Sequence, residues 1–170
     1  MKQKLRVKQI WPASWHLRGS VTLFANTQII KHKFYTVNYN TTRNVANYVE
    51  YTLTKTEVLE ERAKRKNNYR PDPLLLVSPR SSDYTRSGYD RGHLAPAEDF
   101  DYSKRAMSES FYMSNISPQE LWFNRGIWFK LEKKVRKLAI QHKKIRVITG
   151  TVFYKDTVKI YWQENENNGS

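Results

Sequence analysis

Cysteine is absent from this sequence of 170 residues, and so is any long apolar run. Without cysteine no disulfide can form, so the composition indicates neither an oxidising nor a reducing compartment. A helix that crosses a bilayer needs about 20 consecutive apolar residues, and no segment approaches that length, so no membrane is expected as a partner. The basic start at residues 1–8 is not followed by the apolar core of a signal peptide. The sequence therefore predicts no particular localisation.

Acidic residues are scarce: 16 Asp and Glu stand against 30 Lys and Arg, which gives a formal net charge of +14 and a pI of about 9.9. Such an excess favours a polyanionic partner, because binding releases the counterions of its phosphates. Nucleic acid is the first candidate, with residues 62–70 and 130–146 as the basic clusters that would contact its backbone. For most individual lysines, a solvated helix face is an equal interpretation. Contacts to phosphate carry little base information, so weak sequence preference is expected.

With 39% hydrophobic residues, the chain is expected to form one compact domain over residues 1–170. Runs rich in β-branched and aromatic residues predict strands at residues 29–39, 47–54 and 146–153, with a short one at 159–162. Residues 57–66 have a helical pattern, and residues 71–88 form a loop rich in turn residues. The result is an α+β fold, with a catalytic loop and helix packed on an antiparallel sheet. A local group of aromatic residues is expected to pack in the core rather than stack on bases: Phe111, Tyr112, Trp122, Phe123, Trp128 and Phe129.

The stretch Asp90-Arg91-Gly92-His93 carries the chemistry of a phosphodiesterase. Arg91 offers a planar, permanently charged fork that matches phosphate oxygens. His93 titrates near neutral pH and can take a proton from an attacking water. Its second ring nitrogen needs a partner, for which Asn115, Asp90 and a backbone carbonyl are the candidates. Taken alone, Arg-Gly-His more often combines a surface charge with a core histidine.

Apolar residues at helical spacing predict a helix over residues 124–142. They are Ile127, Leu131, Val135 and Leu138.

Asn124 lies at the N-terminal edge of this helix, and Glu132 follows roughly 12 Å along the axis and about 80° around it. Direct ligation of one ion by both is therefore unfavourable, but Glu132 leans back toward the N-terminus and can act through a metal-bound water. One amide ligand with several waters suits Mg²⁺. In the alternative interpretation, Asn124 caps the helix and Glu132 pairs with Arg136 at the surface.

Taken together, three blocks closely resemble the DNA/RNA non-specific endonucleases, whose members include secreted bacterial nucleases and mitochondrial endonuclease G. The blocks are Asp90-Arg91-Gly92-His93, Ser114-Asn115-Ile116-Ser117-Pro118-Gln119 and residues 124–132. Their order and gaps match as well as their letters, and the resemblance covers roughly residues 28–154.

The resemblance implies a ββα-metal motif in which His93 is the general base and Asn124 the protein ligand of a single divalent metal. That metal would be Mg²⁺, with Mn²⁺ as the alternative. Glu132 would hold a metal-bound water, Arg91 would contact phosphate, and Asn115 would belong to the same site. The implied function is sequence-non-specific hydrolysis of DNA and RNA, with 5′-phosphate and 3′-hydroxyl ends.

The chain also departs from the family pattern. In the simplest gap-free alignment, Asn67 stands where the family has an upstream phosphate-binding arginine, and Arg65 or Arg70 would have to replace it. Family members continue past the strand that ends near Gly150 with further elements, so the domain is expected to be shortened at its C-terminus. The alternative function is a catalytically weak or inactive nucleic-acid-binding protein. Whether a homodimer forms or a protein inhibitor binds is not predicted.

Overall fold

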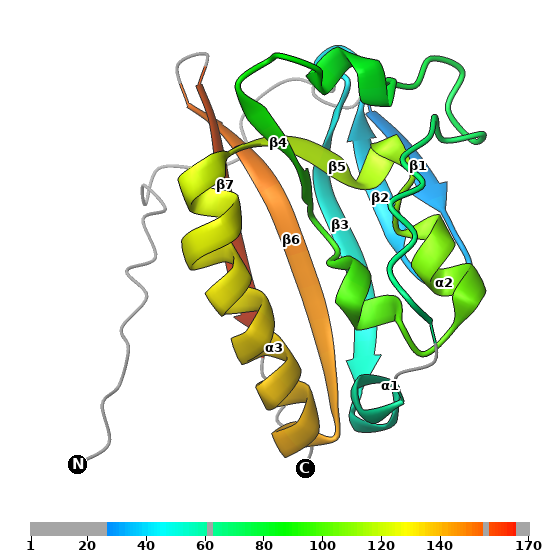
Figure 1. Ribbon diagram of the computed structural model, residues 1–170, viewed down its shortest axis with the longest axis vertical. Helices are drawn as coiled ribbons and strands as arrows, with labels where there is room; N and C mark the ends of the chain where they lie inside the picture. The colour runs from blue at the N-terminus through cyan, green and yellow to red at the C-terminus, as the bar shows by residue number, and fades with distance from the viewer. Residues whose placement is uncertain (1–26, 61–62, 155–156, 166–170) are drawn as a thin grey trace, which may run out of the picture.

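A computed structural model describes residues 27–60, 63–154 and 157–165 (Figure 1). Its main element is a five-stranded antiparallel sheet in the order β1-β2-β3-β6-β7. The strands are β1 (Thr27–Lys31), β2 (Thr36–Asn40), β3 (Val45–Thr54), β6 (Lys144–Tyr154) and β7 (Thr157–Asn165). β3 and β6 are neighbours in the sheet, so everything between them in the sequence forms one long excursion from the sheet.

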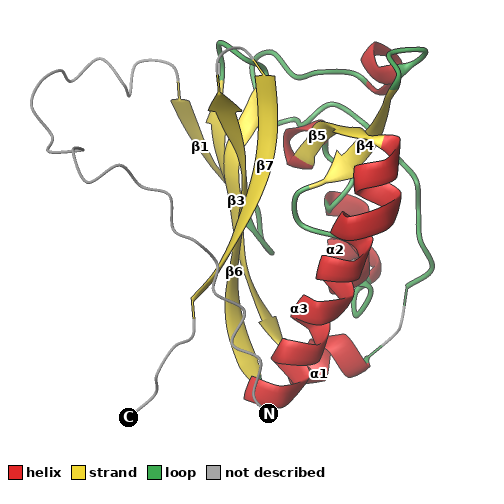
Figure 2. Cartoon of the chain, turned by 90° about the vertical axis from the view of Figure 1, so that its left-hand side faces the viewer, coloured by secondary structure: helices red, strands yellow, loops and turns green. Residues whose placement is uncertain are grey.

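This excursion contains short helices, one long helix and a second, two-stranded sheet. Its elements are α1 (Lys55–Leu59), η2 (Ser81–Tyr84), β4 (Tyr89–His93), η3 (Ala97–Phe100), α2 (Lys104–Glu109), η4 (Met113–Asn115), β5 (Ile116–Glu120), η5 (Phe123–Trp128) and α3 (Phe129–His142). In the side view, the helices and the β4–β5 pair lie on the same side of the large sheet (Figure 2). The fold therefore has two layers, and the excursion is the second layer.

The main core lies between these two layers. Side chains alternate across a strand, and in β3 the residues Val49, Tyr51 and Leu53 are buried. Glu50 lies on the opposite face, where its carboxylate accepts a hydrogen bond of 2.8 Å from Arg146 on β6. The alternation thus gives the sheet one apolar face, which the excursion covers.

The predicted α+β class and antiparallel sheet are confirmed, and residues 47–54, 146–153 and 159–162 all lie in strands. The prediction of one strand over residues 29–39 is wrong. The chain turns between β1 and β2, where the backbone N–H of His32 donates to the carbonyl of Tyr35 at 3.0 Å. β-rich composition alone does not reveal this turn, because residues on both sides of it belong to strands.

The predicted helix at residues 57–66 is mostly wrong. α1 covers only Lys55–Leu59 and begins with a capping box between Thr54 and Glu57. Residues 63–66 are not helical, and the backbone N–H of Ala63 donates instead to the carbonyl of Asp101 at 2.8 Å.

The predicted helix at residues 124–142 is present but begins irregularly. A π-helix, η5, precedes α3, and α3 ends where the sequence predicts, at His142. The wider π turn changes the angular phase, so Ile127 is 61% exposed, whereas Trp128 is 3% exposed and takes the core-facing position. The prediction of core packing is likewise wrong for Trp122 and Phe129, which are 70% and 37% exposed.

The loop predicted at residues 71–88 is irregular apart from the single turn η2. Residue composition did not predict the β4–β5 pair, whereas the resemblance implied a strand pair, with His93 on a loop or strand, through its ββα-metal motif. In the part of the chain that the structure describes, no helix is both long and apolar enough to span a membrane.

Candidate active site

The strand pair β4–β5 positions the Arg-Gly-His stretch. Gly92 pairs with Ser117 and His93 with Ile116. A Cβ at Gly92 would lie 2.0 Å from Cδ of Gln119, so no side chain fits there unless Gln119 moves. Glycine is therefore required at this position by the close approach of β5.

The side chains of Arg91 and His93 lie on one side of β4, against Tyr69. The Arg91 guanidinium carbon and the His93 ring centroid are each 5.6 Å from the centre of the Tyr69 ring. The His93 ring also contacts Phe111 edge-on, with centroids 4.8 Å apart. The imidazole is thus fixed between two aromatic rings.

Burial governs the protonation of His93, which is 6% exposed. Desolvation, with a smaller contribution from the positive charge of Arg65, lowers the pKa of His93 from 6.5 to about 3. The ring is therefore neutral at pH 7. Its Nε2 atom is buried and has no hydrogen-bond partner in the described structure, which is unusual for a buried polar atom.

Two of the three candidates for holding the His93 ring are side chains, Asn115 and Asp90. Asn115 is fully buried, and its amide bonds backbone groups of Ala95 and Ser110 at 2.8–2.9 Å. Asp90 bonds to side chains of η5 instead. Neither side chain is therefore directed at the imidazole, and Asn115 fixes the backbone that follows His93.

Arg65 and Arg70 differ in their surroundings. Arg70 donates to the carbonyls of Asn68 and Ser108, at 3.2 and 2.7 Å, and lies 4.1 Å from the centre of the Tyr112 ring. Arg65 is exposed, lies 5.2 Å from the centre of the Phe111 ring, and is the cation that acts on His93. Of the two, Arg65 therefore lies beside the histidine.

One edge of the Arg91 guanidinium is fixed by a backbone carbonyl. Its Nε and Nη2 atoms donate to the carbonyl of Ser81, at 3.2 and 2.9 Å. A guanidinium carries five N–H donors, so bonding to one carbonyl leaves donors for an anion beside His93.

Asn124 belongs to a second group of residues, centred on Asp90. The Asn124 amide donates to the Asp90 carboxylate at 3.0 Å, and Arg125 donates to both carboxylate oxygens at 2.8 Å. The hydrogen bond from Arg125, supported by the one from Asn124, lowers the pKa of Asp90. The alternative interpretation of Asn124 as a helix cap is wrong, because the residue lies within η5.

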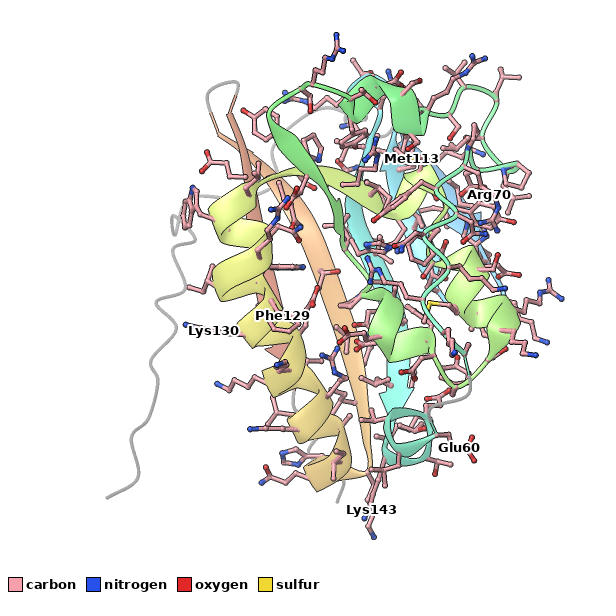
Figure 3. All side chains as sticks on the ribbon, viewed as in Figure 1. Glu60, Arg70, Met113, Phe129, Lys130 and Lys143 are labelled. Carbon is pink, nitrogen blue, oxygen red and sulfur yellow. The ribbon has the colours of Figure 1, made fainter. Side chains whose placement is uncertain are left out.

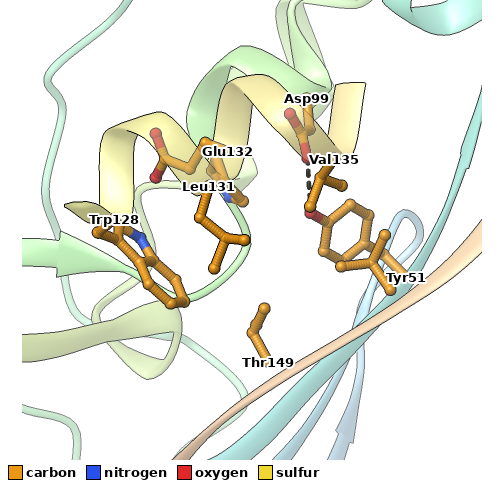
Figure 4. Close-up of a pocket in the computed structure, with 9 residues that line it drawn as sticks. Tyr51, Asp99, Trp128, Leu131, Glu132, Val135 and Thr149 are labelled. Carbon is orange, nitrogen blue, oxygen red and sulfur yellow. Dashed lines mark hydrogen bonds between the residues drawn. The ribbon is translucent and has the colours of Figure 1, made fainter. Parts of the chain in front are cut away.

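Glu132 lies in a third group, at a pocket between α3 and the sheet (Figure 4). Tyr51 and Thr149 reach the pocket from the sheet, and the Tyr51 hydroxyl donates to Asp99 at 2.5 Å. Burial and then the neighbouring charge of Asp99 raise the pKa of Glu132 from 4.5 to about 8.

The alternative interpretation of Glu132 as a surface partner of Arg136 is also wrong. The Arg136 guanidinium bonds Asp99 at 2.9 Å and Glu98 at 2.7 Å. Glu132 is half-buried and faces the pocket.

Trp128 connects the first and third groups. Its indole N–H donates to the carbonyl of His93 at 3.1 Å, and its ring lines the pocket of Glu132. Within residues 27–60 and 63–151, no hydrogen bond joins the His93 ring to Asn124 or Glu132. Asp99 and Arg125 were not predicted as site residues, because neither belongs to a periodic pattern.

The described residues contain no cluster of three or more His, Asp or Glu side chains that could hold a metal ion. Any metal here would depend on few protein ligands. Asn124 fits that requirement: its amide nitrogen is bound to Asp90, so the orientation of its side-chain oxygen, a hard ligand, is fixed.

Comparison with known proteins identifies the family. Residues 17–169 match the model of the DNA/RNA non-specific endonuclease family, and the chain belongs to this family. In a crystal structure of the EndoG/EndoGI complex, one chain is 31% identical and superposes with a TM-score of 0.68, over 79% of this chain and 58% of that one. The fold is thus that of the ββα-metal nucleases.

Individual relatives are nucleases by name. The chain is 37% identical over 123 residues to the mitochondrial nuclease EXOG of Danio rerio, covering 69% of this chain and 36% of that protein. It is 40% identical over 105 residues to the mitochondrial nuclease of Saccharomyces cerevisiae, covering 59% and 32%. A nuclease of Nostoc sp. is 34% identical over 128 residues, covering 74% and 46%. The chain therefore spans a third to a half of these relatives.

Proposed function

We propose that this protein is a metal-dependent endonuclease that hydrolyses phosphodiester bonds of DNA and RNA without sequence preference. Membership of the family supports the reaction class. The observation that carries the proposal is the buried, unpartnered Nε2 of a neutral His93, with Arg91 and Arg65 beside it.

His93 would act as the general base. A neutral imidazole can accept a proton from water, but a pKa of about 3 makes it a weak base as it stands. An anionic phosphate bound by Arg91 and Arg65 would offset the positive charge that disfavours protonation. Substrate binding would therefore raise the basicity of His93 at the moment when it is needed.

Asn124 would hold the metal, most simply Mg²⁺, with Mn²⁺ as the alternative. Bonding of its amide nitrogen to Asp90 presets the side-chain oxygen as the ligand. When bound, the ion supplies electrostatic stabilisation of the phosphate charge and of the leaving oxygen. Such a reaction would leave 5′-phosphate ends.

Glu132 would take part through water rather than by direct ligation. Its pKa of about 8 keeps a large protonated fraction at neutral pH, and a nearby divalent cation would favour the ionised form. The ion pairs of Arg136 with Asp99 and Glu98 fix the neighbouring carboxylates. Glu132 is therefore the carboxyl group of the pocket whose ionisation would change when a cation binds.

The test is cleavage of supercoiled plasmid and of a long RNA in Mg²⁺ or Mn²⁺, with and without EDTA. We expect that both substrates are cut and that EDTA abolishes the cutting. The 5′ ends of the fragments should accept a kinase label only after a phosphatase has removed their 5′-phosphates. His93→Ala should lose about 10²- to 10⁴-fold in rate and keep binding. His142→Ala is the matched control, since His142 is exposed at the end of α3.

Intact plasmid and RNA with the wild-type chain in either metal would overturn the proposal. Salt-sensitive binding without cutting would then identify a nucleic-acid-binding protein derived from a nuclease.

A further inference from the structure

Trp122 is an aromatic side chain that the fold holds in place without burying it. Its indole is 70% exposed. The indole N–H donates to the carboxylate of Glu120, and the ring packs edge-on against Phe123, with centroids 6.1 Å apart at 87°. An exposed tryptophan fixed by two neighbours offers a ready-made flat surface.

Other exposed apolar residues lie close to Trp122 in the sequence or across the β4–β5 pair. Leu121 is 43% exposed and Ile127 is 61% exposed, both near Asn124 in sequence. Tyr89, 50% exposed, pairs with Glu120 across the β4–β5 sheet. We call these four residues, Tyr89, Leu121, Trp122 and Ile127, the apolar rim. It flanks the Asp90–Asn124–Arg125 group, where the metal is proposed to bind.

The charges beyond the rim favour a polyanion. The exposed side chains along α3 include Lys130, Lys133, Lys134 and Lys137, and Lys130 points away from the body of the protein in Figure 3. Glu132 is the carboxylate of α3, and it faces the pocket instead. The carboxylate of Glu120 is engaged by the indole of Trp122.

A flat aromatic surface beside a row of cations matches one ligand chemistry, a nucleic-acid strand with accessible bases. In single-strand binding sites, bases stack on aromatic side chains while cations follow the backbone. In a continuous duplex the bases are stacked on each other, so exposing one costs unpairing energy.

We propose that Trp122 is a stacking platform for an unpaired base next to the scissile phosphate, an inference that rests on the proposed function. The enzyme would thereby favour single-stranded or locally unpaired DNA and RNA over continuous duplex. Trp122 is a specificity-determining residue in this scheme, and His93 and Asn124 keep their proposed roles.

The test compares kcat/KM for one oligonucleotide as a single strand and as a duplex with its complement. Trp122→Ala should lower kcat/KM on the single strand by about 5- to 150-fold, as expected for loss of one base–aromatic stack, and on the duplex less than about two-fold. Trp122→Phe keeps an aromatic face and should retain most of the preference. Leu76→Ala is the control, because Leu76 is fully exposed but lies in the loop at residues 71–88.

Equal losses on both substrates for Trp122→Ala would overturn the proposal, since they would mean that Trp122 only supports the turn around Asn124. A second result would also overturn it: light scattering shows that the wild type is a dimer and Trp122→Ala a monomer, and the substrate preference is unchanged. The rim would then be a contact between protein chains.

If the wild-type chain cuts neither substrate, the proposed function fails, but the platform is still testable by binding. A single-stranded oligonucleotide should quench the tryptophan fluorescence of the wild type more than that of Trp122→Phe. Equal quenching of the two would overturn the platform.

Discussion

The raised pKa of Glu132 makes a quantitative prediction for the variant Glu132→Gln. In the folded protein this pKa is about 8, against an ordinary value of 4.5. The folded state therefore binds a proton more tightly than the unfolded state between these values. The stability that depends on this proton is fully present below about pH 4.5 and is lost as the pH rises toward 8.

The magnitude follows from the size of the shift. Each pH unit in this window changes the free energy of unfolding by at most about 1.4 kcal/mol, or about 4 kcal/mol between pH 5 and 8. Because Glu132 is only half-buried, solvent screening reduces this, and we expect about 2 kcal/mol. Glutamine keeps the size of the neutral carboxyl group and does not titrate. When the pH is raised from 5 to 8, the Tm of Glu132→Gln minus the Tm of wild type should therefore increase by roughly 4–8 °C.

The assay is thermal unfolding followed by circular dichroism from pH 5 to pH 9, in EDTA so that no divalent cation influences Glu132. Glu98→Gln is the matched control, because it removes a carboxylate that is 50% exposed and pairs with Arg136. Its effect should stay within about 1 kcal/mol at every pH. A constant Tm difference between Glu132→Gln and wild type across this range would refute the reasoning.

Three further predictions concern the strand pair and its surroundings. Gly92→Ala should cost about 1–3 kcal/mol by overpacking against Gln119; urea unfolding measures this, and failure of a second change, Gln119→Ala, to restore part of it would contradict the steric account. Asn115→Ala removes three buried hydrogen bonds and should cost about 2–4 kcal/mol in the same assay, so a loss below about 1 kcal/mol would show that water replaces the amide. Because the folded pKa of His93 is about 3, below its ordinary 6.5, stability should fall as the pH drops from 6.5, by at most about 1.4 kcal/mol per unit; His93→Gln should flatten this dependence in EDTA melts, and an unchanged slope would be inconsistent with a buried neutral ring.

Much of the frame was predictable from the sequence because it rests on local composition and periodicity. The strands β3 and β6 follow from runs rich in β-branched and aromatic residues, and the helix that ends at His142 follows from apolar residues at helical spacing. The π turn at the start of this helix was not predictable from the same pattern. Because a π turn holds one more residue than an α turn, the side chains that precede α3 are rotated about the helix axis. Trp128 therefore faces the core, where the apolar pattern placed Ile127.

Residue composition missed the β4–β5 pair because Asp90-Arg91-Gly92-His93 and Ser117-Pro118-Gln119 are poor in strand-forming residues. Their pairing is a tertiary effect, stabilised by the contacts of Gly92 with Gln119. For the site, residue chemistry drew attention to His93, Asn124 and Glu132. It could not choose between Arg65 and Arg70, because that choice depends on which loop side chain contacts Phe111.

The excursion that carries the candidate site leaves and rejoins the sheet at a single point. Thr54 pairs with Lys144, and the backbone N–H of Lys55 donates to the carbonyl of Lys143 at 2.7 Å. Because the chain leaves β3 and enters β6 at paired positions, a segment of any length between Lys55 and Lys143 begins and ends at the same place on the sheet. New loops, and with them new substrate preferences, can therefore be exchanged in this segment while the register of the supporting strands stays the same.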